Sequence, residues 1–176
     1  MEQENQEIGN KMFGVALVRQ NPWVFFIIFL EGYVVLATEV LAMRQLIPFV
    51  GSSIEVVSIV IAGVLVPLAW GYYCGSKQRK IEAVRPCLSQ NFSKAAIFLA
   101  LGLSYSVIVL FFSLLEAVGI HGFLTQTILY VAAFIVYPIF LLAQTLPLLS
   151  HFLSTHHPAL VAGGTLFFST MGSFVG

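Results

Sequence analysis

Long apolar runs alternate with short polar stretches along this chain. Four runs of about 20 residues and one shorter run are separated by segments that contain proline, glycine or charged residues. A helix that crosses a bilayer needs about 20 predominantly apolar residues. The pattern therefore predicts five membrane spans, at about residues 23–43, 54–74, 95–115, 126–149 and 161–176.

Residues at the ends of these runs help to place the helix boundaries. Pro22 begins the first run and Arg44 is expected to end it. Ser52 and Glu55 have the spacing of a capping box, in which two side chains pair with free amides at a helix start. The fifth run is too short for a full span, so we expect a helix that is either cut or shielded by a neighbour.

Composition supports a membrane protein. The 176 residues are 59% hydrophobic and 9% charged, against roughly 25% charged in an ordinary soluble domain. The formal net charge is zero, which gives no indication of nucleic acid as a partner. We predict an all-α fold, a polytopic transmembrane helix bundle in contact with the lipid bilayer, with a polar N-terminal segment (residues 1–22) before a transmembrane domain (residues 23–176).

The distribution of Lys and Arg predicts the orientation. Most basic residues lie between the second and third runs: Lys77, Arg79, Lys80, Arg85 and Lys94. Lys11 and Arg19 precede the first run, so a cytoplasmic N-terminus leaves only Arg44 on the other side. A basic cluster of this size also attracts anionic lipid, although topology signalling explains it equally well.

Two carboxylates lie inside the first predicted span. An ionised carboxylate in a bilayer is costly unless it is paired, neutralised or wetted, so Glu31 and Glu39 need a compensating polar environment. Their separation of eight residues is a rise of about 12 Å and a rotation of about 80° on an α-helix. We expect both on loosely the same side, with Glu31 deeper and Glu39 nearer the outer surface.

The candidate ligand-binding residues are polar groups of the first and fourth runs: Glu31, Glu39, Arg44, Gln45, Gln144 and Thr145. One interpretation is a polar site in the outer half of the bundle. The alternative is a structural ion pair between Glu39 and Arg44 that locks the first helix against its neighbours. Arg44 follows Glu39 by five residues, about 140° around a regular helix, so such a pair needs a bend or another helix.

Prolines and glycines within the runs have two possible uses. Pro67, Pro138 and Pro147 each remove a backbone donor inside the membrane, and such kinks either line a substrate site or are passive. Two pairs of glycines lie four residues apart, at 71 and 75 and at 172 and 176. This spacing lets helix backbones approach closely, and helix packing is its simplest interpretation.

Signatures of catalysis are missing from the sequence. It contains no aspartate, no Walker loop, and no G-x-G-x-x-G, G-x-S-x-G or H-E-x-x-H motif. His151, His156 and His157 have spacings that fit no familiar helical ligand pair. We therefore expect no metal, no cofactor and no enzyme activity within this chain.

Several short motifs occur in a fixed order: EGYVVLATEVLAMR at 31–44, GSS at 51–53, GYYCG at 71–75, TLPLLS at 145–150 and TLFFSTMGS at 165–173. In this order they resemble the membrane part of the bacterial transmembrane spermidine synthase-like proteins. The resemblance covers most of residues 31–176 and implies the bacterial inner membrane.

The same resemblance implies a cytoplasmic Rossmann-like aminopropyltransferase domain, which uses decarboxylated S-adenosylmethionine and putrescine. Its glycine-rich cofactor loop and catalytic aspartates have no counterpart in this sequence, so the activity is not carried over. The chain is then either a separate or excised membrane half, or a protein with a function other than polyamine synthesis.

Three functions fit the sequence. The first is a non-enzymatic membrane module of the spermidine synthase-like type, which anchors or regulates a cytoplasmic catalytic partner and binds a polyamine or small cation near Glu31 and Glu39. The second is half of a small-solute carrier, a homo-oligomer that dimerises through its glycine faces. The third is a structural subunit of a larger membrane complex, in which polar residues serve only helix packing.

Overall fold

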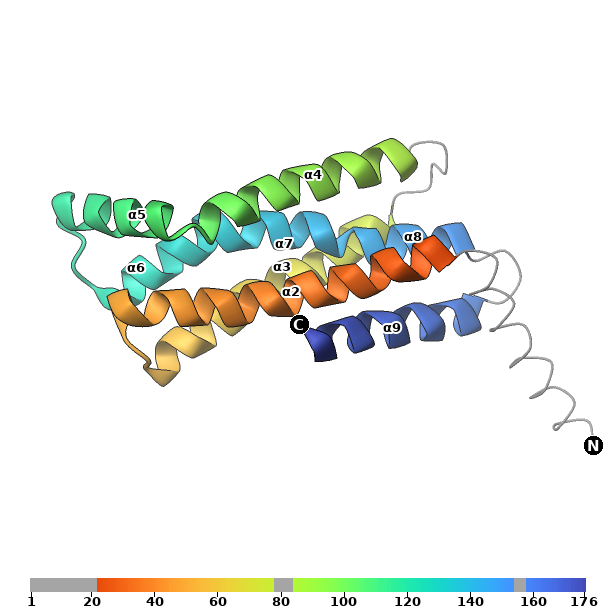
Figure 1. Cartoon of the computed structure of the whole chain (residues 1–176), viewed down its shortest axis with the longest axis horizontal. Coiled ribbons are helices and arrows are strands. Elements are labelled where there is room, and N and C mark those ends of the chain that lie inside the picture. The colour runs from red at the N-terminus through yellow and green to blue at the C-terminus, as the bar shows by residue number, and fades with distance from the viewer. Residues whose placement is uncertain (1–21, 78–83, 154–157) are drawn as a thin grey trace, which may run out of the picture.

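The computed structural model describes residues 22–77, 84–153 and 158–176, and all regular structure in these ranges is helical (Figure 1). The elements are α2 (Pro22–Val50), α3 (Ile54–Ser76), α4 (Val84–Gly102), α5 (Tyr105–Ala117), α6 (Phe123–Tyr130), the π-helical turn η2 (Val131–Ile135), α7 (Val136–Ala143), α8 (Thr145–Leu153) and α9 (Pro158–Val175). The helices run roughly along one long axis, and the main hydrophobic core draws on α2 through α7. The predicted all-α bundle is confirmed.

Three helical segments are long and apolar enough to cross a bilayer: Pro22–Val50, Ile54–Ser76 and Phe123–Ser150. A fourth crossing is present if Leu88–Gly102 and Tyr105–Ala117 form one bent span. The fifth predicted span corresponds to α9, whose apolar part is shorter than a bilayer crossing. Among the described residues, helix length and composition therefore support three or four spans, and a fifth span stays a prediction.

The ends of α2 and α3 differ from the prediction. α2 continues past Arg44 to Val50, because a long exposed Arg side chain can extend from a helix without ending it. Gly51, with a φ of 79°, marks the turn that follows. The N-cap of α3 is Ser53 rather than Ser52, and its hydroxyl oxygen accepts a hydrogen bond from the Val56 amide at 3.3 Å.

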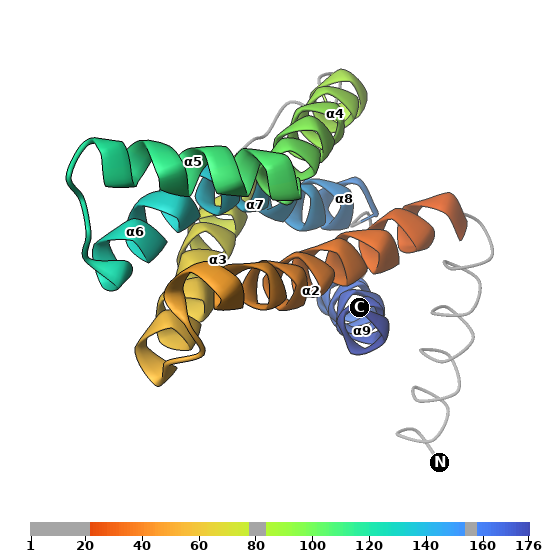
Figure 2. The same cartoon turned by 60° about the vertical axis from the view of Figure 1, so that its left-hand side comes forward.

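A sharp bend interrupts the third predicted span. α4 ends at Gly102 and α5 starts at Tyr105, with an angle of 65° between their axes. Figure 2 shows the two helices diverging from this point. The buried Tyr130 hydroxyl donates a 2.6 Å hydrogen bond to the Gly102 carbonyl, so a side chain of α6 satisfies a backbone oxygen at the break. This bond replaces a partner that lipid cannot supply.

Two prolines explain the irregular course of the fourth predicted span. The π-turn η2 ends three residues before Pro138, and the break between α7 and α8 at Gln144 lies three residues before Pro147. A proline ring clashes with the carbonyl four residues earlier and removes one donor, so the helix widens or breaks on that side. Pro67 leaves α3 continuous.

The glycine pairs are helix contacts within this chain. α2 and α9 run in parallel, and a Cβ on Gly172 would overlap the Phe29 carbonyl while one on Gly32 would overlap the Ser169 carbonyl. Gly71 and Gly75 meet the backbone of α7 and of Gln144 in the same way. Packing is thus their observed use, and the described part of the chain already covers the faces through which the carrier hypothesis places a dimer contact.

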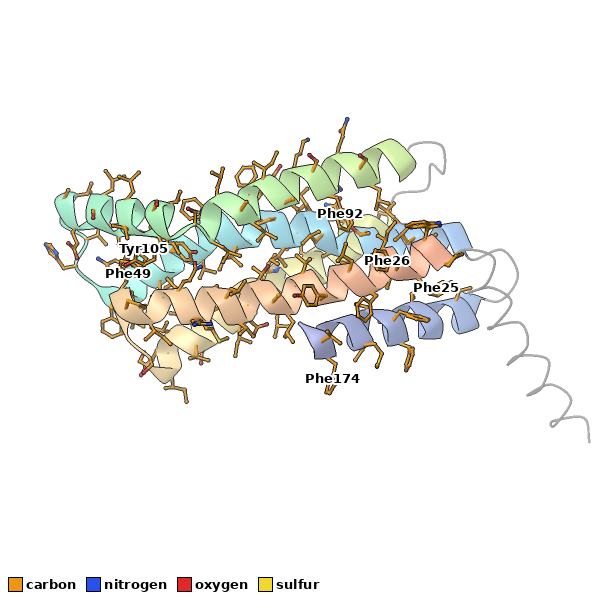
Figure 3. The ribbon with its side chains drawn as sticks, in the orientation of Figure 1. Phe25, Phe26, Phe49, Phe92, Tyr105 and Phe174 are labelled. Carbon is orange, nitrogen blue, oxygen red and sulfur yellow. The ribbon has the colours of Figure 1, made fainter. Side chains whose placement is uncertain are left out.

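Aromatic residues show which face of α9 packs against α2 and which face is exposed. Phe25 lies between α2 and α9 in Figure 3, where its ring centroid is 4.9 Å from that of Phe168. Phe174 points away from the bundle and is 87% exposed. α9 therefore has one face packed on the first half of α2 and another face directed outward.

Adding a methyl group at Gly172 should destabilise the bundle. Gly172→Ala forces α9 away from the Phe29 carbonyl, and overpacking of this kind costs about 1–3 kcal/mol. Gly163→Ala is the matched control, since a Cβ there meets nothing within 4 Å. Denaturation of both variants in detergent checks the expectation, and equal stability of the two would contradict the close contact.

Removing the hydroxyl of Tyr130 should loosen the bend. Tyr130→Phe leaves the Gly102 carbonyl buried without its partner, at a cost of about 1–3 kcal/mol in unfolding free energy. Tyr105→Phe is the control, because Tyr105 is 62% exposed. Amide hydrogen exchange around residues 99–104 should also accelerate in Tyr130→Phe alone.

Candidate functional site

Glu31 is the most deeply buried charged side chain of the described residues. It is 1% exposed, on the face of α2 that also carries Val35, Thr38 and Ala42 into the bundle. Neither of its carboxyl oxygens has a hydrogen-bond partner. Ser169 of α9 faces the carboxyl without making a hydrogen bond of ordinary geometry. A carboxyl in this setting is costly to bury and requires an explanation.

A cavity of about 180 Å³ lies beside this carboxyl, between α2, α3 and α9. Glu31 and Glu39 both line it from α2, and Ser169 and Ser173 line it from α9. The α3 side is aliphatic except for Tyr72. The cavity therefore joins two carboxyls, two hydroxyls and one phenol within an apolar wall.

The only charged residue types in the cavity lining are acidic. None of its lining residues is Lys, Arg or His. The Ser173 hydroxyl already donates within the protein, with the Gly32 carbonyl at 3.1 Å and the Ser169 carbonyl at 3.2 Å as acceptors. Two acidic groups without a basic neighbour favour a bound cation, which would supply the missing charge and the missing donors.

The two carboxylates lie on either side of the middle of α2. Counted along α2, Glu31 lies nine residues after Pro22, and Glu39 lies eleven residues before Val50. Because α2 continues past Arg44, Glu39 lies well inside the helix rather than near its end. Glu39 is half-buried where it lines the cavity, whereas Glu31 is fully buried.

Arg44 and Gln45 do not line this cavity. Arg44 is exposed, and no basic group of the described residues lies beside Glu39, so the structural ion pair offered as the alternative is absent between Glu39 and Arg44. Gln45 is half-buried, and its side-chain oxygen is buried without a hydrogen-bond partner. Both residues lie beyond the cavity, toward the C-terminal end of α2.

Gln144 and Thr145 form a separate polar spot at the break between α7 and α8. Asn91 of α4 donates a 3.3 Å side-chain hydrogen bond to Gln144, whose backbone packs against Gly75. Thr145 is buried, and its hydroxyl has no partner. Of the six predicted residues, the structure thus brings only Glu31 and Glu39 together in the cavity.

Three polar lining residues were missed from the sequence: Tyr72, Ser169 and Ser173. Ser169 and Ser173 are four residues apart, which indicates that they share one face of α9. Nothing in the sequence shows that this face meets Glu31. That pairing depends on α9 lying parallel to α2.

Of the three histidines that were considered and rejected as a metal site, His156 and His157 lie outside the described residues. The same holds for residues 1–21 and for residues 78–83, which contain Arg79 and Lys80. In the part of the chain that the structure describes, no three His, Cys, Asp or Glu side chains gather closely enough to hold a metal ion.

Comparisons with known proteins do not identify a family for this chain. No protein-family model, curated protein or solved structure matches it. The likeness to spermidine synthase-like membrane domains therefore stays a prediction from the ordered motifs. The geometry of the cavity has to carry the functional argument.

Replacing Glu31 by Met should stabilise the protein. The substitution keeps the side-chain length and removes a buried group without hydrogen bonds, which should raise the unfolding free energy by about 1–3 kcal/mol. Glu116→Met, at an exposed position of α5, should change little. Denaturation in detergent provides the measurement. A loss of stability in Glu31→Met would show that the carboxyl has a partner in the folded protein.

Proposed function

We propose that this chain is a non-enzymatic membrane module that binds a small organic cation in the cavity between α2, α3 and α9. The carrying observation is that both oxygens of the buried Glu31 carboxyl lack partners beside a cavity that Glu39 also lines. Proteins retain buried ionisable groups in membrane segments chiefly for function. A cation in this cavity gives the two carboxyls the partner that the protein does not provide.

A linear polyamine is the cation class that fits best. Glu31 and Glu39 are eight residues apart on one continuous helix, a rise of about 12 Å. A compact monoamine reaches only one of them, whereas ammonium groups spaced along an extended chain reach both. The aliphatic side chains of α3, including Val64 and Leu68, provide contact for the methylene segments between the charges.

The module is proposed to sit in a bacterial inner membrane with its N-terminus in the cytoplasm, where it anchors or regulates a catalytic partner. The start of α2 and the end of α3, next to the basic loop, lie at the same end of the bundle (Figure 1). This arrangement supports the orientation, because segments rich in Lys and Arg remain in the cytoplasm. The ordered motifs of residues 31–173 support the family.

Binding of labelled spermidine to the purified full chain tests the proposal. Saturable binding is expected, and Glu31→Gln should weaken it by about tenfold or more, the worth of one charge-assisted hydrogen bond. Glu39→Gln should weaken spermidine more than butylamine, since only the longer amine reaches Glu39. Glu116→Gln is the control and should bind like the unchanged protein. The proposal would be contradicted if spermidine showed no saturable binding, or if Glu116→Gln lost as much affinity for spermidine as Glu31→Gln.

A small-solute carrier is the second candidate. The observation that favours it is the break at Gln144 together with the π-turn η2, both inside one membrane-spanning segment. Interrupted helices of this kind frequently line solute pathways in transporters. Uptake of labelled spermidine into sealed vesicles separates the two functions, because a binding module shows saturable binding without accumulation.

A further inference from the structure

A second hollow lies on the opposite side of α3 from the carboxylate cavity. This groove has a volume of about 400 Å³ and runs between α3 and the α6–η2–α7 segment. Gly63 and Pro67 form its floor on one side, and Val131 and Ala132 of the π-turn lie on the other. Its lining is aliphatic and aromatic throughout. It is larger than the carboxylate cavity, and its apolar lining is unsuited to binding water or a polar solute.

The local geometry of two helices creates this groove. The Val131 side chain lies directly against the backbone of Gly63, where a Cβ would overlap it, and the widened turn of η2 displaces the helix at that level. The groove opens on a face where Val66 and Trp70 are 63% and 65% exposed. In a membrane this face meets lipid, so hydrocarbon is the medium that occupies it.

An exposed stripe leads from the groove to a positive charge. Val66, Trp70, Tyr73 and Lys77 follow one another at intervals of four, three and four residues, so they share one face of α3. The Lys77 ammonium lies 4.1 Å from the centroid of the Tyr73 ring, which holds it on this face. Lys77 is exposed at the C-cap of α3, where the membrane span ends.

We propose that this groove is a binding site for one acyl chain of an anionic phospholipid, whose phosphate is held by Lys77. The apolar groove selects hydrocarbon, and the lysine at its membrane-surface end selects a negative headgroup. Trp70 lies between them, at the position that interfacial aromatic residues favour. From Trp70 to Lys77 is seven residues, about 10 Å along the helix, which separates the chain from its headgroup.

Native mass spectrometry of the full chain with phosphatidylglycerol and phosphatidylcholine of identical acyl chains tests this site. Phosphatidylglycerol should be retained about fivefold more strongly, the value of one lysine at a membrane surface. Lys77→Gln should reduce that preference to near one, while Lys94→Gln, at an exposed position of α4, should leave it unchanged.

Filling the groove should abolish retention of both lipids. Ala132→Phe places a ring in the groove from the π-turn, and Val66→Trp fills it from α3. Ala133→Phe is the matched control, because Ala133 is exposed in the same turn and does not line the groove. Far-ultraviolet circular dichroism establishes that each variant is folded.

Equal retention of the two lipids, or unchanged retention in both groove-filling variants, would overturn the site. So would a dimer that Ala132→Phe dissociates, since a second copy of the chain would then be the occupant. Loss of spermidine binding in these variants is not expected, because the groove and the carboxylate cavity lie on different faces of α3.

Discussion

Lipid offers no hydrogen-bond partners, and this constraint governs the whole structure. Every backbone group inside the bilayer has to be satisfied within the protein, which is why the apolar runs form helices and why polar side chains turn inward. Thr38 and Thr127 follow this rule by donating to carbonyls four residues earlier in their own helices. Glu31, Gln45 and Thr145 depart from it, because each has a buried side-chain oxygen without a partner. Glu31 is the one ionisable group among these three residues, so its departure is the best indication of function in the described part of the chain.

Two helix breaks each carry a hydrogen bond from a side chain of another helix. At the α4–α5 bend the Tyr130 hydroxyl satisfies the Gly102 carbonyl, and at the α7–α8 break Asn91 pairs with the Gln144 side chain. Both compensating side chains come from other helices. These two hydrogen bonds thus join different helices at the breaks, whereas the Glu31 carboxyl has no such bond.

α3 separates two sites of opposite chemistry. Its Val64, Leu68 and Tyr72 face the carboxylate cavity, at intervals of four residues. Gly63, Pro67 and Trp70 face the apolar groove on the other side. One helix can serve both because none of the α3 residues that line either site is charged. The acidic groups come from α2, and the groove's opposite wall comes from η2 and α7.

The sequence by itself determined that this chain is a helical membrane protein, because that property depends on local hydrophobicity and run length. It also identified Glu31 and Glu39 as the residues that need an explanation, and the glycine pairs as packing positions. It did not reveal that α2 continues through Arg44, since nothing in a single apolar run fixes where a helix ends.

Only the tertiary structure decided which polar residues meet. The parallel packing of α9 on α2 brings Ser169 and Ser173 to Glu31, while the proline breaks place Gln144 and Thr145 elsewhere. Contacts of this kind join residues more than 130 positions apart, and periodicity within one helix contains no information about its neighbour.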